Sequence, residues 1–194
     1  MSGFLDRLQE NLQVMTSLRA LEPELERAAN CCVASLAAGG KILVCGNGGS
    51  AAEAMHLVGE LVGRYKKDRR PLSAIALGVD PALSSCIGND YRYQDIFARP
   101  LEAIGRREDV LIVFSTSGES PNILEALRKA AEIGIASIAF LGRDGGSARD
   151  LAAHSLIVRH QDTARIQEGH QFLMHSLMDF LEASVDCKTQ ILGC

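Results

Sequence analysis

His56 and Glu60, four residues apart, are the first pair in this sequence whose types and spacing suit chemistry. On a helix, this spacing places both side chains on one face. A carboxylate can act as a general base, and histidine with a carboxylate can bind zinc. The alternative is a surface pair that only supports the helix. A glycine-rich loop, residues 46–50, comes shortly before the pair and makes it a candidate site.

The glycine-rich loop joins an expected strand to an expected helix. Residues 41–45 form a short apolar run that predicts a buried strand, and residues 51–61 predict a helix that carries His56 and Glu60. Such a loop presents backbone N–H groups at a helix N-terminus, where a phosphate binds well. Binding there would bring a sugar phosphate within reach of a side chain about 9 Å further along the helix.

The same loop also fits a dinucleotide fingerprint at Gly46, Gly48 and Ala51. That interpretation expects an acidic residue about 20 positions further on, at the end of the next strand. The first candidate, Asp80, comes later and follows a Gly-Val pair. The sequence therefore favours a phosphate loop over a dinucleotide loop.

A second polar loop, residues 115–120, follows the expected strand 110–114. Pro121 suits the first position of a helix, so Ser120 could serve only as its N-cap. Four hydroxyl groups in six residues exceed the need of one cap. We therefore interpret the loop as a second anion site at a helix N-terminus.

Apolar runs that alternate with helical segments predict the fold. The expected strands are residues 41–45, 73–77, 110–114, 135–141 and 156–158. This order predicts an α/β domain with a doubly wound, largely parallel five-stranded sheet and helices on both faces. Ligands of such sheets bind beyond the carboxyl ends of the strands, where both polar loops are expected.

Helices are also expected at both ends of the chain. In the first, Leu5, Leu8, Leu12 and Met15 recur at helical spacing, and a second helix begins at Pro23. Because the first helix precedes the sheet, its apolar face must pack on the domain or on another subunit. The last helix, residues 163–184, carries a polar row of Gln167, Gln171 and His175, with His170 off that row.

Two further segments allow a structural or a functional interpretation. Residues 88–90, Gly-Asn-Asp, are typical of a turn that follows a short helix begun by Pro81. Residues 64–70 are strongly basic and suit a solvated loop, or a contact to the substrate phosphate or to a partner.

Length and composition favour a single domain over residues 1–194. The net charge of −4 gives no reason to expect nucleic acid or an acidic membrane surface as a partner. We expect no membrane span and no signal peptide, because charged residues interrupt the first apolar run. The six cysteines form no C-x-x-C pair, and we interpret them as reduced thiols of a cytoplasmic protein.

In order along nearly the whole chain, several segments resemble the phosphoheptose isomerases of the sugar isomerase (SIS) domain family. They are Gly46-Asn47-Gly48-Gly49-Ser50, Ala54-Met55-His56, Glu60-Leu61, Gly88-Asn89-Asp90, Ser115-Thr116-Ser117-Gly118, Arg165-Ile166-Gln167-Glu168 and His175. The resemblance implies interconversion of sedoheptulose 7-phosphate and D-glycero-D-manno-heptose 7-phosphate through an enediol. The product would supply the heptose of bacterial surface lipopolysaccharide.

The resemblance also implies roles for individual residues. Glu60 would be the base and His175 its acid/base partner. One zinc ion per subunit would be bound by His56, Glu60, Gln167 and His175. The substrate would contact Asn47, Gly48, Gly49, Ser50, Glu60, Asn89, Asp90, Ser115, Thr116, Ser117, Ser120 and Gln167. Ala164 departs from the acidic residue that some relatives carry there, so a contact from that position is lost.

The resemblance suggests a homotetramer, which the N-terminal helices would help to build. Gln167 and His175 are about 12 Å apart along one helix, so a single ion bound to both would require strained side chains. We therefore expect an active site shared between chains, or a ligand that leaves the metal. Two alternatives stay open: a non-catalytic adaptor that binds the replication initiator, and a sugar-phosphate sensor. The adaptor relatives lack the histidine and glutamate set that this chain keeps, and a sensor would bind the ligand without turnover.

Overall fold

The computed structural model describes residues 3–191, with side chains placed through residue 184. One parallel sheet has the strand order β2-β1-β3-β4-β5. Its strands are β1 (Ile42–Gly46), β2 (Ala74–Ala76), β3 (Val110–Ser115), β4 (Ala136–Gly142) and β5 (His154–Val158). The expected fold class is therefore confirmed.

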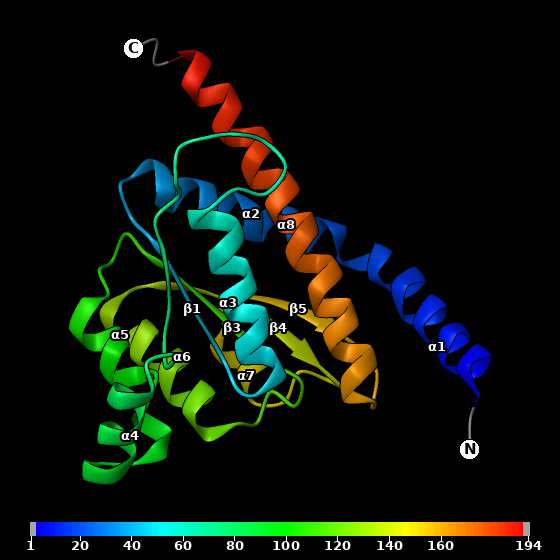
Figure 1. Ribbon diagram of the computed structural model, residues 1–194, viewed down its shortest axis with the longest axis horizontal. Helices are drawn as coiled ribbons and strands as arrows, with labels where there is room; N and C mark the ends of the chain where they lie inside the picture. Colours follow the sequence, from blue (N-terminus) through cyan, green and yellow to red (C-terminus); the bar gives the residue numbers. More distant parts are fainter. Residues whose placement is uncertain (1–2, 192–194) are drawn as a thin grey trace.

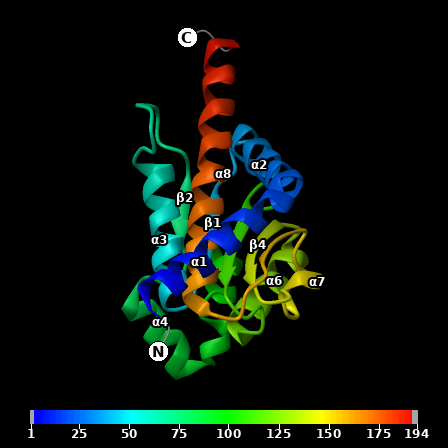
Figure 2. The ribbon, with the colours of Figure 1, turned by 90° about the vertical axis from the view of Figure 1, so that its right-hand side faces the viewer.

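Helices cover both faces of this sheet (Figures 1 and 2). They are α1 (Phe4–Ser17), α2 (Glu22–Ala37), α3 (Gly49–Val62), α4 (Pro81–Asp90), α5 (Ala98–Ile104), α6 (Pro121–Ile133), α7 (Ala148–Leu151) and α8 (Thr163–Ile191), with 3₁₀ turns η1 (Leu18–Leu21) and η2 (Tyr93–Asp95). Within the described chain, no helix combines the length and the apolar character that crossing a bilayer requires.

The alternating side chains of the strands divide the core into two clusters. Ile42 and Val44 of β1 pack with helices α1, α2, α3 and α8 on one face. Leu43 and Cys45 pack with helices α4, α5, α6 and α7 on the other. Every residue of β1 and β3 is buried, which is why these strands are continuous apolar runs in the sequence.

After β1 and after β3, the chain continues toward opposite faces and opposite edges of the sheet. From β1 it continues through α3 to edge strand β2, and from β3 through α6 to β4. Gly46, at the end of β1, pairs in register with Phe114, near the end of β3. The two polar loops therefore begin side by side, at the switch point where α/β sheets bind ligands.

Some local predictions were wrong. Gly88, Asn89 and Asp90 form the last turn of α4, because Ile87 anchors the helix in the core. Helix α7 and both 3₁₀ turns were not predicted, and α8 is longer than expected. On α3 we expected Met55, Val58 and Val62 to share the apolar face, but the buried face contains Ala54, Leu57 and Leu61, and Met55 and Val62 are exposed.

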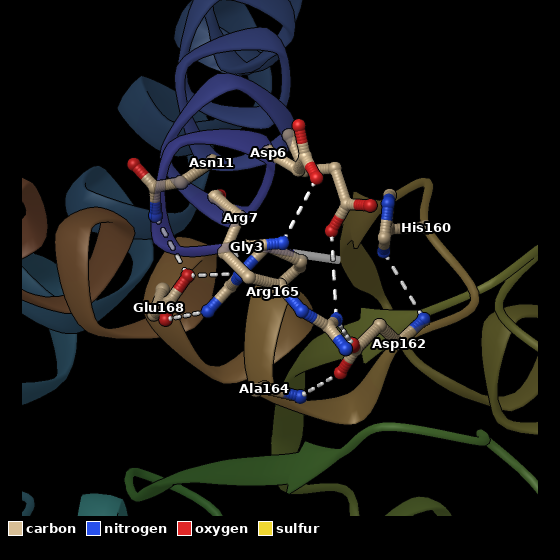
Figure 3. A network of polar contacts seen from close by, with 10 residues as sticks. Gly3, Asp6, Arg7, Asn11, His160, Asp162, Ala164, Arg165 and Glu168 are labelled. Carbon is tan, nitrogen blue, oxygen red and sulfur yellow. Dashed lines mark hydrogen bonds and ion pairs between the residues drawn. The ribbon is translucent and has the colours of Figure 1, made fainter. Parts of the chain in front are cut away.

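Helix α1 is attached to the start of α8 by polar contacts (Figure 3). Arg7 pairs with Asp162 at 2.7 Å, and Asn11 donates to Glu168 at 2.7 Å. Arg165 binds Glu168 and also donates to the carbonyl of Arg7. One side of α1 is therefore held by its own chain, while Phe4, Leu5, Leu8 and Leu12 remain exposed.

The basic segment 64–70 is not simply a solvated loop. The Arg69 guanidinium is 4% exposed, pairs with Glu182 of α8 and donates to the carbonyls of Glu60 and Leu61. Arg69 thereby satisfies the last carbonyls of α3 and connects this end of the helix to α8.

Candidate active site

Three side chains of ligand type converge between α3 and α8. One nitrogen or oxygen atom from each of His56, Glu60 and His175 lies within 4.8 Å of the others. His56 Nε2 and Glu60 Oε1 are 3.0 Å apart, as expected for neighbours four residues apart on a helix. The sequence predicted these three residues for one site, and the structure brings them together within one chain.

Gln171 lies among these residues and was not predicted as a site residue. Its Nε2 is 3.0 Å from Nδ1 of His56 and 3.1 Å from Nε2 of His175. An amide nitrogen can only donate, so both ring nitrogens are placed to accept. His56 then carries its proton on Nε2, which donates to Glu60. The only sequence feature that pointed to Gln171 was the polar row that it forms with Gln167 and His175.

His175 is further enclosed by aromatic rings. It stacks on Tyr65 with ring centroids 5.7 Å apart and meets His56 edge-on at 5.2 Å. Burial lowers the pKa of His175 below its usual range, and the neighbouring His56 lowers it further. The imidazole is therefore neutral at neutral pH, as a metal ligand or proton acceptor must be.

The glycine loop and the serine loop are joined by two asparagines. Asn47 and Asn122 exchange side-chain hydrogen bonds of 2.9 and 2.8 Å. Asn122 is buried in the first turn of α6, and no local sequence pattern predicts its contact with a residue 75 positions away. A cavity of about 590 Å³ opens beside the pair, lined by Asn47, Arg92, Tyr93, Gln94, Ser120, Pro121 and Asn122.

The hydroxyl groups of the serine loop have different surroundings. Ser115 is buried and accepts from the N–H of Gly118, and Ser117 accepts from the N–H of Glu119. Ser120 occupies the N-cap position of α6 without a side-chain capping bond. Ser120 lines this cavity, and its role in binding a ligand stays a prediction.

The Gln167 side chain lies against the glycine loop. A Cβ atom at Gly49 would overlap the Gln167 side-chain amide, which would have to move away. Gly48, with φ of 56°, forms the left-handed N-cap of α3, and Ser50 is buried below it. Gln167 therefore brings the second turn of α8 next to the glycine loop.

Asn89 and Asp90 lie apart from these groups within the chain. Asn89 donates to Asp90 at 2.7 Å, and both are exposed at the end of α4. Neither makes a polar contact with α3 or α8 among the described residues. Their substrate role stays a prediction.

The arrangement changes the expectation of a shared site. Glu60 and His175 meet inside one protomer, so variants at these two positions cannot complement each other by supplying groups from different chains. Any contribution from a neighbouring chain must come from other residues.

Comparisons with known proteins agree with this fold and site. Residues 4–142 match the SIS domain family. Phosphoheptose isomerase 1 of Campylobacter jejuni is 45% identical over 176 residues, which cover 91% of this chain and 95% of that protein.

Two solved structures have closely similar folds. Phosphoheptose isomerase GmhA from Neisseria gonorrhoeae has a TM-score of 0.86 at 38% identity, covering 91% of this chain and 95% of that one. A phosphoheptose isomerase from Francisella tularensis has a TM-score of 0.84 at 35% identity, covering 93% and 98%. The resemblance noted in the sequence is confirmed: this chain belongs to the phosphoheptose isomerases of the SIS domain family.

Proposed function

We propose that this chain interconverts sedoheptulose 7-phosphate and D-glycero-D-manno-heptose 7-phosphate, and so supplies heptose for bacterial lipopolysaccharide. The observation that carries the proposal is the convergence of His56, Glu60 and His175 within 4.8 Å, with the first two on a helix that begins at the glycine loop. The name of the Campylobacter jejuni relative supports the same substrate class.

Glu60 is the proposed base that moves a proton between the two carbons next to the carbonyl. Its carboxylate is 20% exposed and is oriented by His56 at 3.0 Å. His175 is the proposed partner that transfers protons at the substrate oxygens. Its lowered pKa supports this role, because a neutral imidazole can accept a proton at neutral pH.

The two loops are the proposed substrate cradle. The phosphate would bind the serine loop through Thr116, Ser117 and Ser120, with Ser115 bracing the loop from within. The sugar would extend along the glycine loop toward the triad, where Gln167 adjoins Gly49. The remaining expected substrate contacts are Asn47, Gly48, Ser50, Asn89 and Asp90.

The side chains of the triad fit a zinc ion, since imidazole nitrogen and carboxylate oxygen are its usual ligands in proteins. His56, Glu60 and His175 would hold the ion, with Gln167 as a fourth group by family resemblance. A bound zinc would polarise the substrate carbonyl as a Lewis acid. Glu60 binds a metal or removes a proton through the same carboxylate, so metal content must be measured with activity.

We further propose that one SIS domain, residues 1–194, assembles as a cytoplasmic homotetramer. The exposed apolar residues Phe4, Leu5 and Leu12 of α1 support an interface there. Met55 and Phe172, next to His56 and Gln171 in the chain, are 49% and 53% exposed. These exposed apolar side chains on α3 and α8 support a contact of the two helices with a neighbouring subunit.

The test is incubation of the purified protein with sedoheptulose 7-phosphate, with NMR detection of the aldoheptose phosphate and measurement of bound zinc. We expect turnover that Glu60→Gln removes. Binding without turnover would indicate a sensor, and neither binding nor turnover would indicate an adaptor. The convergent triad favours neither alternative, because both can function without such a set.

A further inference from the structure

Glu53 of α3 and His170 of α8 are titratable residues that the proposed reaction does not use, and they are buried together. Glu53 is 7% exposed and His170 is 0% exposed. Glu53 Oε2 lies 3.8 Å from His170 Nδ1, which suits an ion pair but is too long for a hydrogen bond. Both oxygens and both ring nitrogens are buried without a hydrogen-bond partner among the described residues.

The surroundings of His170 are apolar. Its ring centroid is 6.0 Å from that of Phe114 on β3 and 6.2 Å from that of Phe140 on β4. In such a medium an unpaired polar group is strongly destabilising. Native proteins leave few such groups, so four polar atoms in one place require an explanation. Each of the two residues has the other as its charged neighbour.

The pair occupies a particular place between the two helices of the triad. On α3, Glu53 precedes His56 by three residues and Glu60 by seven, so all three follow one side of the helix. On α8, His170 lies between Gln167 and His175. The contact therefore connects α3 with α8 on the sheet side of the triad.

We propose that Glu53 and His170 form a buried hydrogen-bonded pair that sets the spacing of α3 and α8, and so positions His56 and Glu60 opposite His175. A movement of about 1 Å, or one bridging water, completes the bond. One proton between carboxylate and imidazole suffices, whichever partner holds it. The pair touches no substrate and is a positioning pair, and its relevance to catalysis rests on the proposed function.

A hydrogen-bonded pair fixes the relative position of α3 and α8 more strictly than an apolar contact does. Apolar side chains allow two helices to slide by small amounts, because their attraction has little direction. A hydrogen bond between Glu53 and His170 requires one relative placement of the helices. A metal site needs such placement, since its ligand distances vary by only tenths of an ångström.

The test is a double-mutant cycle with Glu53→Leu, His170→Phe and the double variant, measured by denaturant unfolding. Each single change leaves one polar group buried alone, so both singles should lower the unfolding midpoint. The double variant should recover most of this loss, because both partners become apolar. If the double variant loses the sum of the two single losses in unfolding midpoint, the two residues do not form a pair.

Measurements of zinc affinity and kinetics distinguish a pair that positions the triad from one that only stabilises the fold. In the double variant we expect zinc affinity, titrated with the metal alone, and kcat each to fall at least about tenfold, as for supports of metal ligands. KM should change less than about threefold, since substrate contacts remain. A double variant with parental zinc affinity, kcat and α3–α8 spacing in its crystal structure would overturn the positioning role.

A matched control is available in the same chain. His154 of β5 and Glu24 of α2 form a partly exposed pair at 2.7 Å that involves neither α3 nor α8. The double variant Glu24→Leu/His154→Phe should keep parental zinc affinity and kcat. If the parent protein fails to isomerise the heptose phosphate, the proposed function is wrong. The unfolding cycle, the zinc titration and the helix spacing still decide the role of the pair.

Discussion

Glu60 is oriented by a neighbour on its own helix, since His56 lies at 3.0 Å. We expect Glu60→Gln to lower kcat about 10²–10⁴-fold, the usual contribution of a positioned acid or base. Gln keeps the size of the side chain, so binding of inorganic phosphate should persist. Steady-state kinetics and bound zinc should be measured together. Turnover within a few-fold of the parent would exclude Glu60 as the base.

His175 leads to an expected pH dependence. Protonation adds a positive charge, which burial and the nearby His56 both oppose, so the pKa of His175 is lowered from its usual 6.5. The neutral imidazole therefore persists to lower pH than for an ordinary histidine. If neutral His175 is essential, the acid limb of kcat/KM should fall below pH 6.5. An acid limb at or above this value would contradict the assignment.

At the scale of elements, the N-terminus of α6 can be tested through Ser120. Its hydroxyl makes no capping bond, and the residue lines the cavity beside Asn47. We expect Ser120→Ala to raise KM more than it lowers kcat, as the loss of uniform binding does, with little change in stability. Ser117→Ala should raise KM as well, but it also removes an acceptor for the Glu119 N–H. A complex with the phosphate at another loop would refute this assignment.

Two glycines of α3 form a matched comparison. A Cβ at Gly49 would displace the Gln167 side chain, whereas a Cβ at Gly59 meets nothing within 4 Å. Gly59→Ala should raise the free energy of unfolding by about 0.5–1 kcal/mol, with parental activity. Gly49→Ala should keep the fold but reduce kcat/KM, measured on the same preparation. Equal activity of the two variants would remove Gln167 from the site.

At the scale of the whole molecule, the exposed face of α1 predicts assembly. We expect Leu8→Glu with Leu12→Glu to reduce the oligomer size measured by light scattering, because buried charges oppose an apolar interface. Gln13→Glu adds charge to the same helix outside the Leu5, Leu8 and Leu12 row and is the control. Unchanged size in the double variant, with retained helical content, would exclude this interface.

The sequence predicted the sheet and the triad but not their supports. Each strand is a short apolar run, and His56 and Glu60 share a helix, so local patterns were sufficient. Asn122 and Gln171 acquire their roles from partners 75 and 115 positions away, which no local pattern contains. The prediction of a turn at Gly88 to Asp90 was wrong because tertiary packing holds these turn-forming residues in the helix.

The two sides of α1 should respond oppositely to the ionic composition of the medium. Its contacts with α8, such as the half-exposed Arg7–Asp162 pair, are weakened when dissolved ions screen the charges. Its apolar side gains affinity for another apolar surface in excluded salts such as sulfate. Sulfate therefore weakens the polar contacts between α1 and α8, but it strengthens the packing of Val14 in the core and any docking of the exposed apolar side on a second surface. The balance between the polar and the apolar contacts of α1 therefore depends on the buffer as well as on the sequence.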